Sequence, residues 1–200
     1  MKNNNIKSVC VFASSSDFLE KSYYEDAASL GELLAAAGMD MVYGGSTLGL
    51  MWACANAVKS NGGKITGVMP QKLCDFGVSS KLCDEFHLTT GMRERKAKMD
   101  ELSDSLIALA GGFGTLEELA EMIVQKQLGY NNKAIVILNT NNFYDKLIEF
   151  FDVIISQNFC KCAPDGLYYV AQTPEDAVEY LKNYTPVFKA LTREELYAKQ

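Results

Sequence analysis

Residues 106–118 read LIALAGGFGTLEE and give the clearest indication of the fold. The first five residues of this stretch are all apolar, which is typical of a strand buried on both faces of a parallel sheet. Three glycines follow, Gly111, Gly112 and Gly114, and a helical pattern begins at Thr115. Glycines let the backbone turn sharply and approach a ligand, and a helix start attracts anions. The stretch therefore predicts a strand, an anion site and a helix in succession.

A plainer interpretation of the same stretch is a turn that only connects strand to helix. Thr115 would then be the N-cap, and Glu118 would complete a T-x-x-E capping box. The motif alone leaves these two interpretations about even. It is neither G-x-G-x-x-G nor a P-loop, because no Gly-Lys-Ser/Thr follows, so it does not support ATP hydrolysis of the P-loop type.

The rest of the chain alternates between strand and helix patterns. Strands are expected at residues 6–13, 39–43, 64–69, 85–88, 106–110, 134–138 and 167–170. Helices are expected at residues 19–37, 48–60, 92–102, 115–128, 142–157 and 174–184, and residues 71–84 read as irregular. This order predicts an α/β fold, a Rossmann-like three-layer sandwich with a mainly parallel sheet flanked by helices. One domain over residues 1–184 and a tail at 185–200 with a short peripheral helix are expected.

Composition narrows the classes of function. The 200 residues hold 25 acidic and 19 basic side chains, a net charge of -6, which disfavours binding to a nucleic-acid polymer. No apolar run approaches the roughly 18 residues of a membrane span, and the start lacks a cleavage-like region, so a cytoplasmic protein is expected. None of the six cysteines forms a C-x-x-C pair, and His87 is the only histidine. No metal site is therefore predicted.

In parallel α/β sheets, ligands bind at the carboxyl ends of the strands. This rule points to the loops at residues 14–16, 44–47 and 111–115 and to the segment before Met92. The second of these loops repeats the glycine pattern, because residues 44–51 read GGSTLGLM. Two such helix starts at one sheet edge favour a phosphorylated ligand. Ordinary turn glycines are the alternative.

Residues 92–102 place charged side chains on two helix faces. Met92, Met99 and Leu102 share one face, and Arg95 falls inside that apolar stripe. A guanidinium in such a place needs an anionic partner, either a functional one or a structural ion pair. Lys96 lies at the border of the stripe, whereas Arg93, Glu94 and Lys98 face away.

The helix that follows the glycines presents its two adjacent glutamates differently. Glu118 lies at the edge of the face that carries Leu119 and Met122, so it is the better candidate for a carboxylate in the cleft. Glu117 points the other way, alongside Glu121, although it is close enough to the first turn to reach a ligand.

With these residues in view, the chain resembles the Lonely Guy (LOG) family, whose members are often labelled "possible lysine decarboxylase". Residues 111–118 match the family pattern P-G-G-x-G-T-x-x-E after the proline, which is Ala110 here. Met92, Arg95 and Lys96 match M-x-x-R-K, and residues 44–51 match G-G-x-x-x-G-L-M. The resemblance covers roughly residues 6–180.

The resemblance implies an enzyme that hydrolyses the N-glycosidic bond of a nucleoside 5′-monophosphate, a cytokinin riboside monophosphate or AMP, to free base and ribose 5-phosphate. It implies no cofactor, and a homodimer whose active sites lie near the subunit interface. The helix at residues 50–58, with Met51 and Trp52, is a candidate for that interface. The family's catalytic arginine and glutamate correspond to Arg95 and Glu118.

In this hypothesis Glu118 stabilises an oxocarbenium-like transition state, and Arg95 holds Glu118 or the ribose hydroxyls. The glycine loop binds the 5′-phosphate, and the serines after the first strand contact the ribose or base. The expected substrate-binding residues are Ser14, Ser15, Gly45, Ser46, Met92, Lys96, Gly111, Gly112, Phe113, Gly114, Thr115 and Glu117.

Two departures from the family pattern bear on the base. Residues 122–125 read MIVQ where the family often has Thr-Trp, and residues 74–80 lack an acidic side chain near Gly77, with Asp75 the closest. The main alternative function is a non-catalytic nucleotide-sensing module on the same fold. A dinucleotide oxidoreductase is less favoured, because the first strand-to-helix turn lacks the fingerprint.

Overall fold

The computed structural model describes residues 6–160 and 166–186. The helix expected in the tail falls mainly on residues 187–200, which lie outside the described residues. No helix in the described ranges combines the length and apolar character that a bilayer span requires.

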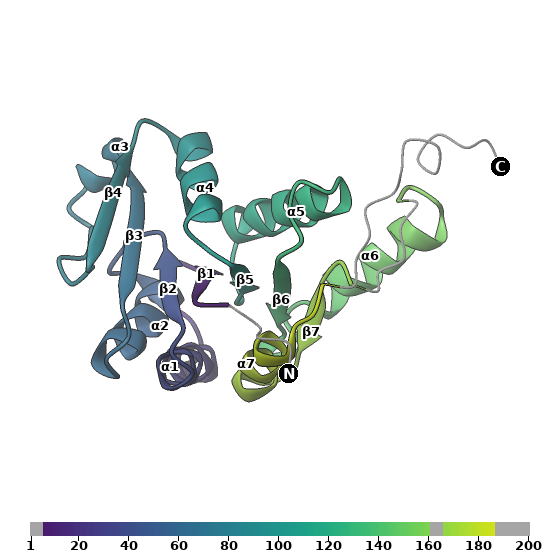
Figure 1. The fold of residues 1–200 in the computed structure, drawn as a ribbon, viewed down its shortest axis with the longest axis horizontal. Coiled ribbons are helices and arrows are strands. Elements are labelled where there is room, and N and C mark those ends of the chain that lie inside the picture. The colour runs from purple at the N-terminus through teal and green to yellow at the C-terminus, as the bar shows by residue number, and fades with distance from the viewer. Residues whose placement is uncertain (1–5, 161–165, 187–200) are drawn as a thin grey trace.

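Across the described residues the strands form one parallel sheet (Figure 1). In spatial order they are β4 (Glu85–Thr89), β3 (Ile65–Pro70), β2 (Asp40–Tyr43), β1 (Ser8–Phe12), β5 (Ser105–Ala108), β6 (Ala134–Leu138) and β7 (Tyr169–Ala171). The helices are α1 (Lys21–Ala36), α2 (Gly49–Ser60), α3 (Gln71–Cys74), α4 (Met92–Glu101), α5 (Phe113–Gln127), α6 (Asp145–Ser156) and α7 (Pro174–Asn183). A 3₁₀ turn, Thr140–Asn142, precedes α6.

Side chains that alternate between the two faces of the sheet form two hydrophobic cores, one under each layer of helices. In β1, Val9 and Val11 join the core under α1, α2 and α7, whereas Cys10 and Phe12 join the core under α4, α5 and α6. Successive side chains of a strand point to opposite faces, so a strand that is apolar throughout fills both cores. Figure 1 shows α4 and α5 on one side of the sheet and α1, α2 and α7 on the other. The predicted sandwich is confirmed.

The structure differs from the sequence-based expectations at two places. Residues 71–84 are not wholly irregular, since α3 follows β3 directly. Helix α5 begins at Phe113 with Gly112 as its N-cap. Thr115 is therefore not the N-cap, and the T-x-x-E capping box does not form. The helix starts inside the glycine run because Gly112 is an acceptable cap without a side chain.

The strand order reverses at β1, whose neighbours are β2 and β5. The loops after β1 and β5 therefore lead away in opposite directions and open a crevice. The backbone holds the two loops together, because the N–H of Ser14 donates a hydrogen bond to the carbonyl of Ala110 at 3.1 Å. This crevice is where the fold places a ligand.

Candidate active site

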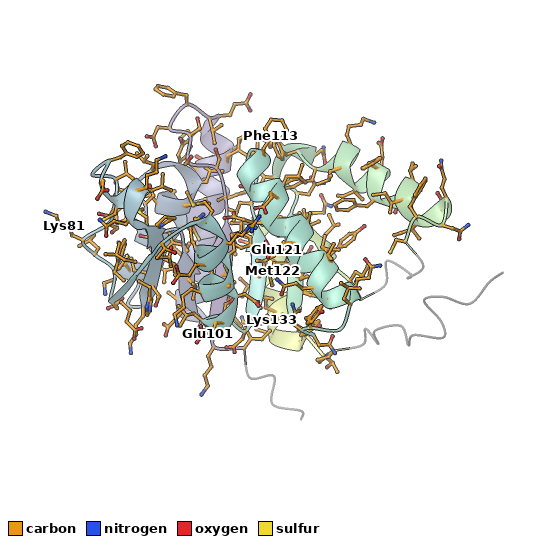
Figure 2. All side chains as sticks on the ribbon, turned by 90° about the horizontal axis from the view of Figure 1, so that it is seen from above. Lys81, Glu101, Phe113, Glu121, Met122 and Lys133 are labelled. Atoms are coloured by element: carbon orange, nitrogen blue, oxygen red, sulfur yellow. The ribbon has the colours of Figure 1, made fainter. Side chains whose placement is uncertain are left out.

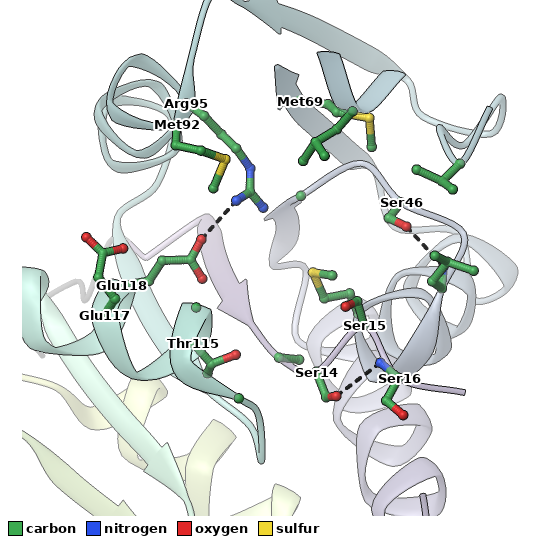
Figure 3. Close-up of a pocket in the computed structure, with 18 of the residues that line it drawn as sticks. Ser14, Ser15, Ser16, Ser46, Met69, Met92, Arg95, Thr115, Glu117 and Glu118 are labelled. Atoms are coloured by element: carbon green, nitrogen blue, oxygen red, sulfur yellow. Dashed lines mark hydrogen bonds and ion pairs between the residues drawn. The ribbon is translucent and has the colours of Figure 1, made fainter. Parts of the chain in front are cut away.

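A cavity of about 540 Å³ opens at the carboxyl ends of the strands, within the usual size range for small-molecule sites. Its walls come from the loops after β1 and β2, from α3 and the loop after it, and from the starts of α4 and α5 (Figure 3). The predicted site residues that line it are Ser14, Ser15, Ser46, Met92, Arg95, Gly112, Gly114, Thr115, Glu117 and Glu118. They come from four separate parts of the chain.

Arg95 and Glu118 form an ion pair in this cavity. The Nη1 of Arg95 donates a hydrogen bond to Oε1 of Glu118 at 3.0 Å, and each side chain is only 9% exposed. The Nε of Arg95 donates to the carbonyl of Val68, at 3.1 Å, in β3. Figure 3 shows the two side chains pointing toward each other from α4 and α5. The guanidinium is therefore held between the carbonyl of Val68 and the carboxylate of Glu118, and both Arg95 and Glu118 line the cavity.

Burial raises the pKa of Glu118 above its ordinary value, because desolvation disfavours the charged form. The positive charges of Arg95 and Lys96 oppose this shift in pKa, and the negative charge of Glu117 adds to it. A buried carboxylate whose pKa is shifted and which faces a cavity is a common feature of catalytic sites.

The start of α5 provides unpaired donors toward the cavity. The helical hydrogen bonds begin with the N–H of Leu116, which donates to the carbonyl of Gly112 at 3.0 Å. The N–H groups of a helix's first turn have no partner within the helix, and they carry partial positive charge. Gly112, Gly114 and Thr115 all line the cavity. An anion can therefore bind at this helix start.

The start of α2 differs from the start of α5, because its first backbone N–H groups already have partners within the protein. The N–H of Gly49 donates to the carboxylate of Asp17 at 2.8 Å, and the N–H of Leu50 donates to the carbonyl of Ser14 at 2.9 Å. Ser46 lines the cavity, but its Oγ accepts a hydrogen bond from the N–H of Leu48. A carboxylate from the β1 loop thus already occupies the position that a phosphate would take at α2.

Four of the predicted substrate-binding residues do not line this cavity. Gly45 packs against the ring of Phe86, and Gly111 packs against the side chain of Thr115. Phe113 is 91% exposed at the start of α5 (Figure 2). Lys96 is ion-paired with Glu117 and Glu121 of α5. A sequence motif specifies positions along the chain and carries no information about the direction in which a side chain points.

An apolar wall of the cavity was missed from the sequence. Leu73, Phe76 and Val78 line it from α3 and the following loop, and Met51 and Met69 add to it. Residues 71–84 carry no motif, and their sequence pattern predicts irregular structure. The only available signal was Met51, within the GGSTLGLM element. This wall suits the flat apolar faces of an aromatic base.

The remaining candidate residues lie outside the cavity. His87 is near Glu85, with 3.6 Å between Nε2 and the carboxylate, and lies on the edge strand β4. Cys10 and Cys54 are buried in the core, and burial raises the pKa of Cys54 to about 12. Within the described residues, no cluster of three or more potential ligands is arranged for a metal ion.

Comparisons with known proteins agree with this geometry. The family model described as "Possible lysine decarboxylase" matches residues 51–181. The probable cytokinin riboside 5′-monophosphate phosphoribohydrolase LOGL9 of Oryza sativa subsp. japonica is 39% identical over 184 residues, which cover 92% of this chain and 81% of that protein. The cytokinin riboside 5′-monophosphate phosphoribohydrolase LOG3 of Arabidopsis thaliana is 34% identical over 186 residues, covering 93% and 86%.

Among solved structures, the molybdenum cofactor binding protein from Rippkaea orientalis superposes with a TM-score of 0.69. It is 22% identical and covers 88% of this chain and 96% of that one, a likeness that shows the fold alone. The family model spans more than half of the chain, and relatives well above 30% identity match nearly all of it. The chain therefore belongs to the LOG family, whose family model is described as possible lysine decarboxylase.

Proposed function

We propose that this protein hydrolyses the N-glycosidic bond of a nucleoside 5′-monophosphate and releases the free base and ribose 5-phosphate. The observation that carries the proposal is the buried pair of Arg95 and Glu118, which faces a cavity beside the free start of α5. The relatives named as phosphoribohydrolases support the same reaction. A module that only bound a nucleotide would have no need of a desolvated carboxylate near the sugar.

The reaction builds positive charge on C1′ and on the ring oxygen as the bond to the base nitrogen breaks. The carboxylate of Glu118 stabilises that charge and accepts a proton from the attacking water, whose oxygen bonds to C1′. The electron pair of the broken bond leaves with the base, which then takes up a proton. Arg95 keeps Glu118 oriented through the 3.0 Å hydrogen bond and is itself held by Val68.

The 5′-phosphate binds at the start of α5, where Gly112, Gly114 and Thr115 line the cavity. The base then lies toward the apolar wall of Leu73 and Phe76, and Ser14 and Ser15 are placed for the ribose. Because Asp17 occupies the start of α2, only one of the two glycine-rich helix starts is free for the phosphate.

The test is a panel of nucleotides and nucleosides followed by chromatography of the free base. AMP and N6-isopentenyladenosine 5′-monophosphate are incubated with the protein, and adenosine and N6-isopentenyladenosine are the matched controls. We expect release of base from the monophosphates and much weaker release from the nucleosides. Equal turnover of AMP and adenosine would refute the phosphate site, and binding of AMP without any release of base would favour a nucleotide-sensing module.

We also propose a homodimer, assembled through the outer face of α5 and α6. None of the residues of helix α6 is fully buried, although its sequence DKLIEFFDVIIS is strongly amphipathic. Phe150 is 57% exposed, and Val124 and Val153 are also exposed. A symmetric dimer buries the same patch on both subunits, so an unpartnered apolar face suits a second copy. Residues 50–58 are a poorer choice, because much of α2 is buried within the core.

The oligomeric state tests the proposed assembly. Light scattering at micromolar concentration should give a dimer, and Val153→Asp should give a folded monomer, because a charge on this face opposes burial. A fully active wild-type monomer would contradict the proposal. The matched control is Lys146→Asp, on the same helix but 87% exposed at its side chain.

A further inference from the structure

Lys96 follows Arg95 on α4, yet it serves a different set of partners. Its side chain is 14% exposed, and its Nζ forms ion pairs with both Glu117 and Glu121 of α5. Figure 2 shows Glu121 on the side of α5 that faces α4. Lys96 does not line the cavity, whereas Glu117 does. Lys96 therefore contacts a residue that lines the cavity without lining the cavity itself.

Glu117 creates an electrostatic problem for the proposed function. It places a second carboxylate next to Glu118 in a cavity that must accept a phosphate dianion. The negative charges of Glu117, Glu118 and a bound phosphate repel one another, and each disfavours the ionisation of the others. The charged groups that face Glu118 are Arg95 and Lys96 from α4 and Glu117 from α5. The thiol of Cys10 in β1 is also near, and burial raises its pKa, so it stays neutral.

We propose that Lys96 is a positioning residue: it neutralises Glu117 and ties α4 to α5, so that the Arg95–Glu118 pair keeps its geometry and the cavity accepts the phosphate. This inference rests on the proposed function and deepens it. The two carboxylates are one helical turn apart, which lets a single ammonium bridge both. The two helices that carry the pair are thereby linked at a second point beside it.

The charge state of Lys96 suits this role. Burial opposes its ionisation, but hydrogen bonds from Nζ to Glu117 and Glu121 raise the pKa of Lys96 above its ordinary value. The ammonium therefore persists at neutral pH and is already neutralised by two carboxylates. It has little capacity left to bind phosphate directly or to act as a nucleophile.

The test compares Lys96→Met, Lys96→Arg, Glu117→Gln and the double variant Lys96→Met/Glu117→Gln. We expect Lys96→Met to lower kcat/KM for AMP by about 10-fold and to move the acid limb of the pH profile of kcat to higher pH by about 0.5 or more. Lys96→Arg should restore most of the activity. Because Lys96 acts through Glu117, its removal should cost clearly less in the Glu117→Gln background.

Lys98→Met is the matched control, since Lys98 lies on the same helix and pairs with Glu101 at 3.1 Å, away from the cavity. It should leave kcat/KM and the pH profile unchanged. A second readout is the titration of the Glu118 carboxyl by ¹³C NMR, with its signal assigned by its loss in Glu118→Gln. Lys96→Met should raise the pKa of Glu118 in that titration.

The outcomes separate this inference from the proposed function. If the wild type releases no base, the proposed function fails, and the Glu118 titration still decides the role of Lys96. If Lys96→Met lowers only the melting temperature and moves neither the Glu118 titration nor the acid limb, Lys96 is merely structural and the inference is overturned. An equal loss of kcat/KM in both Glu117 backgrounds also overturns it, because that result shows that Lys96 does not act through Glu117.

Discussion

The guanidinium of Arg95 occupies the space that a Cβ on Gly44 would need. Gly44 follows the last residue of β2, and Arg95 reaches it from α4. In the chain, α2, β3, α3 and β4 lie between the two residues. Gly44 is therefore required because Arg95 packs closely against it. Its φ is not positive, so the backbone conformation does not require a glycine there. The GGSTLGLM element, whose glycines suggested an anion-binding loop, thus makes room for the guanidinium of Arg95.

Gly44→Ala should displace Arg95 and disturb its pair with Glu118. We expect kcat/KM for AMP to fall by about 10²-fold, because small misplacements of catalytic groups have effects of that order. The measurement is steady-state release of adenine. Gly91→Ala is the control, since a Cβ there meets nothing within 4 Å and its φ of -165° suits any residue. Near-wild-type activity of Gly44→Ala would show that Arg95 has another workable position.

Glu118→Gln tests the catalytic carboxylate. The substitution keeps size and helix propensity, and the new amide oxygen can still accept the hydrogen bond from Arg95, so the fold should survive. Loss of the charge should lower kcat by about 10²-fold or more, about 3 kcal/mol of transition-state stabilisation. Arg93→Ala, exposed on the outer face of α4, should be nearly silent. Turnover of Glu118→Gln close to that of the wild type would remove Glu118 from the mechanism.

The pH dependence follows from the direction of the pKa shift of Glu118. The reaction needs the ionised carboxylate, and burial raises its pKa above the ordinary 4.5. Activity should therefore be full well above this raised pKa and be lost as the pH falls through it, at a pH higher than 4.5. This loss of activity at acid pH is measured in a profile of kcat from pH 4 to 8. A midpoint at or below 4.5 would contradict the assignment.

Lys126 supplies a stability test away from the cavity. It is fully buried, and its Nζ donates hydrogen bonds to the carbonyl of Lys133 at 2.8 Å and to the hydroxyl of Tyr184 at 3.0 Å. Burial lowers its pKa from 10.5 to about 8. Between these values the unfolded chain holds a proton that the folded chain has lost, so stability rises with pH across that window.

The measurement is urea unfolding of the wild type and Lys126→Met at pH 7 and pH 10. The difference in free energy of unfolding, wild type minus variant, should increase toward pH 10, by at most about 3 kcal/mol. Other titrating groups are shared and cancel in the difference. A constant difference between the two pH values would show that the buried amine keeps its ordinary pKa.

The sequence alone determined the layers of the fold and the two central site residues. Strands that are apolar throughout can only be buried on both faces, so the alternation of strand and helix predicted the parallel sandwich. Helical periodicity placed Arg95 on the same helix face as Met92 and Met99, and Glu118 at the edge of an apolar face. Both inferences need only local spacing, and both side chains are indeed buried. Local spacing also placed Glu117 next to Glu121, but it did not reveal the lysine between them.

The tertiary structure decided everything that depends on residues far apart in the chain. Only the packed fold brings Asp17 to the start of α2, Lys96 between two carboxylates of α5, and Arg95 against Gly44. A glycine-rich helix start has the same sequence pattern whether a phosphate or a neighbouring carboxylate satisfies its N–H groups. Which of the two occupies it depends on loop positions set by the whole sheet, and no local pattern encodes those positions.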